Sequence, residues 1–81
     1  MTRDDILTQI KGVLAELFEI DPVRVTPEAS LYADLEIDSI DAVDLIDHIR
    51  RLTATRVSGE DFRSVRTIGD LISVIERLTA R

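Results

Sequence analysis

A serine hydroxyl next to carboxylates is the group in this chain that is best placed for chemistry. Ser39 lies in the stretch Asp38-Ser39-Ile40-Asp41, after a long segment of turn and acidic residues and before apolar residues that recur at helical spacing. Asp38 therefore occupies the position of a helix N-cap, where its carboxylate can accept from free N–H groups and the helix dipole favours an anion. The pattern predicts that Ser39 is about the first helical residue and presents its hydroxyl at the helix start.

Ser39 lacks the partners that a catalytic nucleophile needs. The only histidine, His48, follows nine residues later, which in a helix is roughly 13.5 Å along the axis and half a turn around it. The chain has no cysteine and no Gly-x-Ser-x-Gly turn, so a catalytic triad is not available. We therefore expect no enzyme activity, a substrate hydroxyl at Ser39, and a surface position for His48, four residues after Asp44.

Alternating acidic residues before Ser39 have the spacing of a calcium-binding EF-hand loop, but the rest of that motif is missing. Asp34, Glu36 and Asp38 follow one another like the first three ligands. The sixth position, where the loop needs glycine, is Ser39, and the twelfth, where it needs a bidentate glutamate, is Leu45. No metal site is predicted.

The predicted first helix begins at a capping box of Thr2 and Asp5 and has apolar residues at positions 6, 7, 10, 13, 14, 17 and 18. Asp21-Pro22 is expected to end it, because the residue before proline is pushed out of the helical region. Residues 20–38 show no helical periodicity and form a long loop. Apolar residues spaced through this loop predict that it is anchored across the bundle: Val23, Val25, Leu31 and Leu35.

The second predicted helix spans residues 39–53 and has two different faces. Its predicted core face comprises Leu45, Ile46, Ile49 and Leu52. Its acidic side comprises Asp41, Asp44 and Asp47. Arg50 and Arg51 then follow Asp47 at the spacing of a helix-surface ion pair. These charges form either a solvated face or a docking face for a partner protein.

Two more helix starts have the same hydroxyl-led capping pattern. Ser58 and Asp61 open a short third helix that runs to about Ser64, and Thr67 and Asp70 open a last helix. The apolar face of the last helix comprises Ile68, Leu71, Ile72, Ile75 and Leu78. The chain is therefore predicted to be all-α, with four helices, a long first loop and a short third helix in a single domain over residues 1–81.

Composition and charge limit the fold and the kinds of partner that the chain can have. Eighty-one residues, 44% of them hydrophobic and 4% aromatic, predict one small domain with an aliphatic core. No basic start before an apolar run and no membrane-length apolar stretch is present, so we expect a soluble, cytoplasmic monomer. The net charge of −6 argues against nucleic acid as a partner. The charge is uneven, because residues 1–49 hold 12 acidic and 3 basic residues, whereas residues 50–81 hold 4 and 7.

The acidic loop, the Asp-Ser-Ile-Asp motif at a helix start and the four helical segments together resemble an acyl carrier protein of the stand-alone kind. The resemblance covers nearly the whole chain, with Ile40 in place of the leucine that usually follows the serine. It implies a four-helix bundle in which Ser39 carries 4′-phosphopantetheine, transferred from coenzyme A by a separate phosphopantetheinyl transferase, the holo-acyl carrier protein synthase. It also implies that Asp38 helps to hold the magnesium of that enzyme and that acyl cargo travels on the arm as a thioester.

The resemblance implies roles for the helix faces as well. Ketosynthase, acyltransferase and other acyl-processing enzymes would dock on the second helix, at Ile40, Asp41, Val43, Asp44, Asp47, Arg50 and Arg51. A core that opens for the acyl chain would be lined by Leu45, Ile49, Ile68, Leu71 and Ile72. The pathway is fatty-acid synthesis or a specialised polyketide or polyene pathway. Because the two arginines stand where general fatty-acid carriers usually have further glutamates, we expect the specialised one.

Two other functions stay open at this point. An aminoacyl or aryl carrier of peptide or polyketide assembly would share the serine motif and the fold. A non-carrier interaction bundle would use Ser39 only as a helix-start residue, since hydroxyl residues are common there. Incubation with coenzyme A and a phosphopantetheinyl transferase separates this last function from both carriers, because only a carrier gains the mass of the arm.

Overall fold

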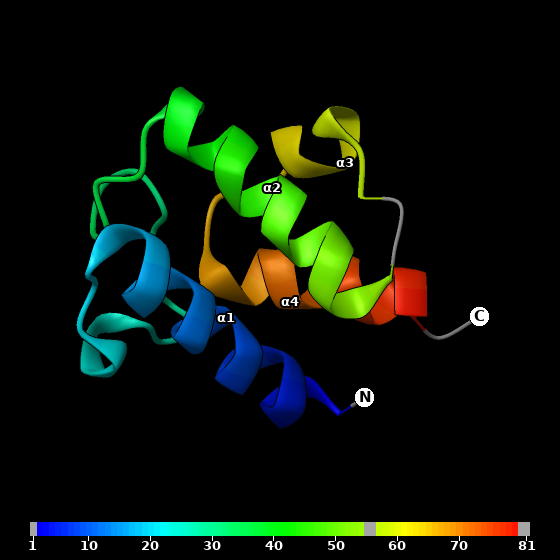
Figure 1. Cartoon of the computed structure of the whole chain (residues 1–81), viewed down its shortest axis with the longest axis horizontal. Helices are drawn as coiled ribbons and strands as arrows, with labels where there is room; N and C mark the ends of the chain where they lie inside the picture. The colour runs from blue at the N-terminus through cyan, green and yellow to red at the C-terminus, as the bar shows by residue number, and fades with distance from the viewer. Residues whose placement is uncertain (1, 55–56, 80–81) are drawn as a thin grey trace.

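Helices form at the four segments where the sequence predicts them. The computed structural model describes residues 2–54 and 57–79, where it contains α1 (Arg3–Phe18), α2 (Ser39–Thr53), α3 (Gly59–Arg63), α4 (Ile68–Thr79) and a 3₁₀ turn, η1 (Pro22–Arg24). α1 packs against both α2 and α4. The short α3 contacts the same two helices (Figure 1). None of the helices in these ranges is long and apolar enough to cross a membrane. The all-α, four-helix prediction is confirmed.

Reciprocal capping explains where the helices begin. The Thr2 hydroxyl accepts from the Asp5 N–H, and the Asp5 carboxylate accepts from the Thr2 N–H, each at 3.1 Å, which is the capping box predicted for α1. Ser58 and Asp61 repeat this arrangement at α3. At α4 the Asp70 carboxylate accepts from the Thr67 N–H at 3.2 Å and the Asp70 N–H donates to the Thr67 hydroxyl. All three predicted capping boxes are therefore present.

The first helix ends earlier than the sequence predicts. Glu19 adopts a left-handed conformation with φ of 55°, and its N–H donates to the Ala15 carbonyl. The next N–H, that of Ile20, donates to the Leu14 carbonyl at 3.3 Å, while the Ile20 side chain is buried. This left-handed cap closes α1 three residues ahead of Pro22, so the proline does not set the end of the helix.

Three of the four predicted loop anchors are buried, and one is not. Val25, Leu31 and Leu35 belong to the core. Val23 is 77% exposed, so its assignment as an anchor is wrong. The reason is local, because the Asp21 carboxylate accepts from the Val23 N–H at 3.0 Å and fixes a 3₁₀ turn that directs this side chain to solvent. The sequence pattern did not reveal this turn.

Mostly aliphatic residues from the helices and the segments that connect them form one core, and the described residues contain no buried charged or polar residue. On α2, Leu45 and Ile49 are buried as predicted, and Ile46 is partly buried against the core. Leu52 is 51% exposed, so its place in the predicted core face is wrong. It lies in the last turn of α2 at the margin of the apolar face, beside α1, where only half of the side chain is covered.

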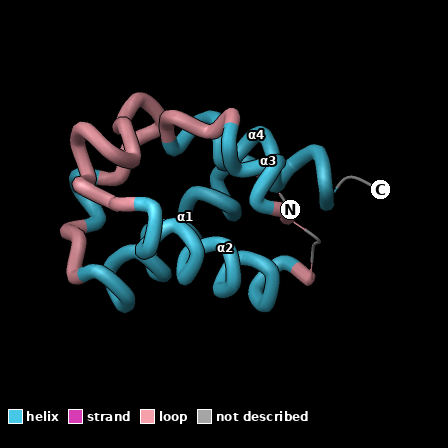
Figure 2. Tube along the Cα trace, turned by 90° about the horizontal axis from the view of Figure 1, so that it is seen from above, coloured by secondary structure: helices cyan, strands magenta, loops and turns pink. Residues whose placement is uncertain are grey.

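The long first loop lies over the end of the bundle where α1 ends and α2 begins (Figure 2). An isolated antiparallel bridge joins Ser30 to Thr67 at the start of α4. Backbone bonds around it run from Leu31 N–H to Arg66 C=O (3.0 Å), Ile68 N–H to Ala29 C=O (3.0 Å) and Gly69 N–H to Pro27 C=O (2.8 Å). The segment that leads to Ser39 is thus tied to α4 by its backbone as well as by its buried side chains.

Gly12 lies inside α1, and nothing lies within 4 Å of the position that a Cβ would take there. We expect Gly12→Ala to stabilise the protein by roughly 0.5–1 kcal/mol, since alanine loses less backbone entropy in a helix than glycine does. Thermal melts followed by circular dichroism would measure this as a rise of a few degrees. Gly69→Ala is the matched control, because its Cβ would lie 3.0 Å from the Pro27 carbonyl oxygen. An equal gain at both glycines would contradict the prediction.

The capping carboxylates make stability depend on acid pH. Hydrogen bonds from backbone N–H groups hold the pKa of Asp5, Asp61 and Asp70 below their ordinary value of 3.8. A carboxyl whose pKa is depressed by folding contributes stability that is fully present above its unfolded pKa and is lost as pH falls through the folded value. We therefore expect Asp61→Asn to lower the melting temperature at neutral pH, with a difference from the parent that shrinks below about pH 4.

Melts of the parent and Asp61→Asn from neutral pH to about pH 2 test this dependence. Glu60→Gln is the control, since it removes an exposed charge from the same turn of α3. A destabilisation by Asp61→Asn that stayed constant down to the lowest pH would show that the ionised carboxylate is not what stabilises the cap.

Candidate functional site

Asp38 caps α2 in the predicted way. It has an extended backbone with φ of −88°, and its Oδ1 atom accepts from the N–H groups of Ile40 at 3.0 Å and Asp41 at 2.8 Å. Its carbonyl oxygen accepts the Ala42 N–H at 2.9 Å, the first bond of the helix. Ser39 is accordingly the first helical residue and is exposed to solvent. One carboxylate thus satisfies two of the free donors of the helix start and leaves the adjacent hydroxyl accessible.

The chain just before the cap is held firmly, which sets the direction in which Ser39 emerges. Glu36 has a positive φ of 55°, and Ile37 is buried, with its N–H donating to the Leu31 carbonyl at 2.9 Å. Leu31 is itself fully buried and bonded through its N–H to the Arg66 carbonyl. The exposed Ser39 therefore follows a buried anchor by only two residues, so the hydroxyl has a defined position at the end of the bundle.

His48 occupies a place apart from the serine. It is half-buried on α2, and its Nδ1 atom lies 3.2 Å from the Asp44 carbonyl oxygen one turn earlier in the same helix. No group of three or more potential metal ligands occurs in residues 2–54 and 57–79. The local chemistry is that of a hydroxyl presented to solvent, so a partner that reacts with it would bring its own base.

Two apolar side chains stand exposed beside Ser39. Ile40 is 75% exposed and Val43 is 65% exposed, on the first turns of α2. Val43 also borders a groove of about 320 Å³ between α2 and α3. The other residues that line the groove are Asp44, Ile46, Asp47, Arg50 and Gly59. The predicted docking residues thus form a surface that combines exposed hydrophobic groups with charged groups. Asp41 is the one predicted docking residue that is half-buried.

The two arginines near the end of α2 make different contacts. Arg51 forms the predicted ion pair with Asp47, with 3.1 Å between Nη2 and Oδ2. Arg50 instead donates from Nε to the Val57 carbonyl at 2.5 Å and so ties α2 to the segment before α3. The sequence spacing made Asp47 a possible ion-pair partner of both arginines. It could not reveal that Arg50 bonds to a backbone carbonyl seven residues away. Arg50 is therefore partly a structural residue, whereas Arg51 is a surface charge.

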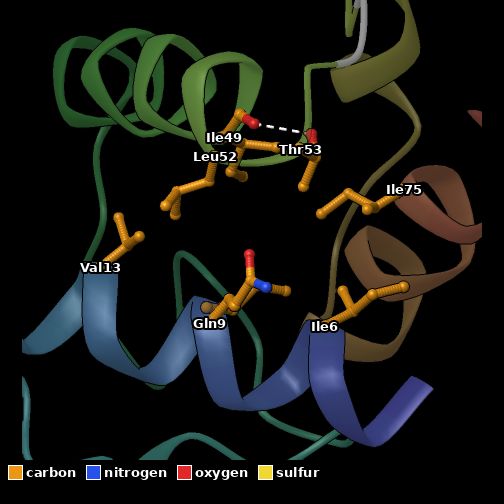
Figure 3. Close-up of a pocket in the computed structure, with 8 residues that line it drawn as sticks. Ile6, Gln9, Val13, Ile49, Leu52, Thr53 and Ile75 are labelled. Carbon is orange, nitrogen blue, oxygen red and sulfur yellow. Dashed lines mark hydrogen bonds between the residues drawn. The ribbon is translucent and has the colours of Figure 1, made fainter. Parts of the chain in front are cut away.

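All five residues predicted to line an acyl-binding core are buried: Leu45, Ile49, Ile68, Leu71 and Ile72. Of these five, Ile49 lines a cavity that measures about 10 Å³ and lies where α1, α2 and α4 meet (Figure 3). The cavity is also lined by Gln9, whose Oε1 atom is buried and has no hydrogen-bond partner in residues 2–54 and 57–79. Sequence reasoning missed Gln9, although its spacing of three and four residues from Ile6 and Val13 places it on the core-facing side of α1.

Comparison with known proteins agrees with this geometry. A family model described as the phosphopantetheine attachment site matches residues 8–75. The chain is 49% identical over 80 residues to acyl carrier protein 2 of Ralstonia nicotianae, and the match covers 99% of each chain. It is 31% identical over 78 residues to the meromycolate extension acyl carrier protein of Mycobacterium tuberculosis, covering 96% of this chain and 68% of that one.

A solved structure shows the same fold. The crystal structure of the acyl carrier protein of Thermotoga maritima superposes with a TM-score of 0.85 at 24% identity, covering 96% of this chain and 91% of the other. Acyl carrier proteins hold their cargo on 4′-phosphopantetheine and are carriers rather than enzymes. From its family match and its full-length relatives, the chain belongs to the phosphopantetheine-attachment family and, within it, to the acyl carrier proteins.

Proposed function

We propose that Ser39 is the residue that carries 4′-phosphopantetheine. The observation that carries this proposal is the exposed hydroxyl at the first position of α2, directly after the Asp38 cap. The residues present fit the group, because a helix N-terminus favours a negatively charged phosphodiester and the hydroxyl can enter the active site of another enzyme. Once bound, the arm supplies a thiol that holds cargo as a thioester.

In this proposal the chain supplies a substrate and a docking surface. Ser39 Oγ forms the new bond to the phosphorus of 4′-phosphopantetheine and loses its proton to a base of the phosphopantetheinyl transferase. The pyrophosphate bond of coenzyme A breaks, and adenosine 3′,5′-bisphosphate leaves. Asp38 holds the helix start through its Oδ1 atom, and its other carboxylate oxygen would help to hold the magnesium of that enzyme. Ile40 and Val43 offer exposed apolar contacts to the transferase and to acyl-processing enzymes.

We further propose that the cargo is an aliphatic acyl chain in fatty-acid synthesis or a specialised polyketide or polyene pathway. The core that surrounds the proposed lining residues is built almost wholly from leucine, isoleucine and valine, which suits an aliphatic guest. The name of the mycobacterial relative refers to meromycolate extension, which also supports a long-chain cargo. An aryl or aminoacyl cargo is the alternative that the measurements below distinguish.

The experiment that tests the carrier function is intact-mass measurement after incubation with coenzyme A and a phosphopantetheinyl transferase. We expect a gain of one phosphopantetheine, and fragmentation of the modified peptide should place it on Ser39. A protein that folds but gains no mass with several transferases would contradict the proposal.

Acyl chains of increasing length should stabilise the protein if they enter the core. Each buried methylene contributes roughly 0.8 kcal/mol, offset in part by the opening of a well-packed core. The melting temperature should therefore rise from the acetyl to the octanoyl form. Melts of the series measure this, and the unloaded phosphopantetheine form is the control. No trend with chain length would place the cargo outside the core, as expected for an aryl or aminoacyl carrier.

A further inference from the structure

One buried acceptor in the core has no donor. The side chain of Gln9 enters the space where α1, α2 and α4 meet, and its amide oxygen points toward α2 (Figure 3). That Oε1 atom is fully buried and accepts no hydrogen bond from any residue that the structure describes. Apart from Thr53, the other residues that line the cavity are apolar, chiefly Ile6, Val13, Ile49 and Ile75. Burial of an unpaired polar atom is unfavourable, so the cavity has a chemical preference for a hydrogen-bond donor.

Neither the protein nor a water molecule suits this acceptor well. Thr53 is the only other polar residue among the described residues that line the cavity, and its hydroxyl proton goes to the Ile49 carbonyl at 2.7 Å. The free volume of about 10 Å³ is the least that holds one water, and a buried water needs two to four polar partners. A guest with an apolar body and one donor group matches the lining better than water does.

The position of the cavity indicates which part of the cargo would reach it. Ile49 belongs both to the cavity wall and to the proposed acyl-binding face of α2. It follows Ser39 by ten residues, which is roughly 15 Å along the helix. A chain that enters the core beside the first turns of α2 would therefore bring its far end, and not its thioester, to Gln9.

From these contacts we infer that Gln9 selects long acyl chains that carry a hydroxyl group at or near the far end. The hydroxyl donates to Gln9 Oε1, while the methylenes pack on the aliphatic side chains of α2 and α4. This inference rests on the proposed carrier function of Ser39 and adds to it the class of cargo. It makes Gln9 a specificity-determining residue that does not touch the attachment site.

The test compares two cargoes on four proteins. Tetradecanoyl and terminally hydroxylated tetradecanoyl groups are loaded on the parent, Gln9→Leu, Gln9→Met and Thr8→Leu. Gln9→Met keeps the length of the side chain without the acceptor, and Thr8→Leu is the control, since Thr8 is exposed on the neighbouring position of α1. Intact mass confirms loading of each protein before melting, so a failure to load counts against Ser39 and not against Gln9.

The quantity compared is the effect of the hydroxyl group, which is the melting temperature of the hydroxylated form minus that of the plain form of the same protein. We expect this effect to be larger in the parent and in Thr8→Leu than in the two Gln9 variants. The difference between these effects should be about 4–8 °C, the shift that one buried hydrogen bond produces in a domain of this size. The same effect of the hydroxyl in all four proteins would overturn the inference.

A second measurement observes the contact itself. Gln9 is the only glutamine and the chain has no asparagine, so its side-chain NH₂ group gives the only carboxamide signal in a nitrogen-correlated NMR spectrum. Acceptance of a hydrogen bond by Oε1 should shift this signal in the hydroxylated form relative to the plain form. A ¹³C label at the terminal carbon should show contacts with the methyl groups of Ile6 and Ile75. An unmoved amide signal together with a solvent-exposed label would overturn the inference.

Discussion

Ser39→Ala is expected to abolish loading by phosphopantetheinyl transferase while the protein stays folded. The variant lacks the serine oxygen that would bond to the phosphorus of the arm. The mass should therefore not increase at all, even after long incubation. Alanine is a better helix former than serine, and the Asp38 cap does not use the Ser39 hydroxyl, so the melting temperature should be unchanged or slightly higher. Intact-mass spectra over a time course, with circular dichroism for the fold, measure both effects.

Two further variants separate the attachment atom from its surroundings. Ser73→Ala removes an exposed serine on α4 and should load at the parental rate. Asp38→Ala keeps the hydroxyl but removes both capping bonds, so it should cost about 1 kcal/mol of stability and slow loading without abolishing it. Continued modification of Ser39→Ala would show that another residue is the attachment site.

Arg51→Glu should weaken the reaction with the cognate ketosynthase and improve recognition by general fatty-acid enzymes. The parent has an Asp47–Arg51 pair at this place on α2, whereas the variant presents two negative charges four residues apart. Complementary charge governs encounter, and like charges suppress wrong partners, so we expect a change in kcat/KM of about tenfold at low salt. The effect should shrink as ionic strength rises, because both side chains are more than half exposed.

Arg50 has to be tested separately from Arg51. Arg50→Glu removes the bond to the Val57 carbonyl, so it should lower the melting temperature as well as change the charge. Arg51→Glu leaves that bond in place and reports on charge alone. Arg66→Glu makes the same charge change at an exposed residue in the connection before α4, which is not one of the predicted docking residues, and should leave the reactions with both enzyme sets unaltered. Unchanged kinetics for Arg51→Glu with both enzyme sets would remove the case for a specialised pathway.

The features that the sequence determined by itself depend on residues close together in the chain. Each capping box joins residues three apart, so Thr2 with Asp5 and Ser58 with Asp61 could be recognised before any tertiary contact was known. The same holds for the Asp38 cap and hence for the exposed position of Ser39. Apolar periodicity then identified most of the core, because a helix buries residues that recur every three to four positions.

The tertiary structure decided the features that depend on contacts between segments far apart in the chain and on how completely those contacts cover each side chain. The periodicity of α2 included Leu52, but the contact with α1 covers only half of that side chain. The sequence spacing predicted an ion pair between Arg50 and an acidic residue of its own helix. In the folded chain Arg50 donates a hydrogen bond to the Val57 carbonyl instead. The unpaired oxygen of Gln9 exists only because α1, α2 and α4 enclose it, and no local pattern encodes a cavity made by three helices. Local hydrogen bonds and spacing thus placed the serine, while packing between remote residues shaped the surface and the interior that would select its partners and cargo.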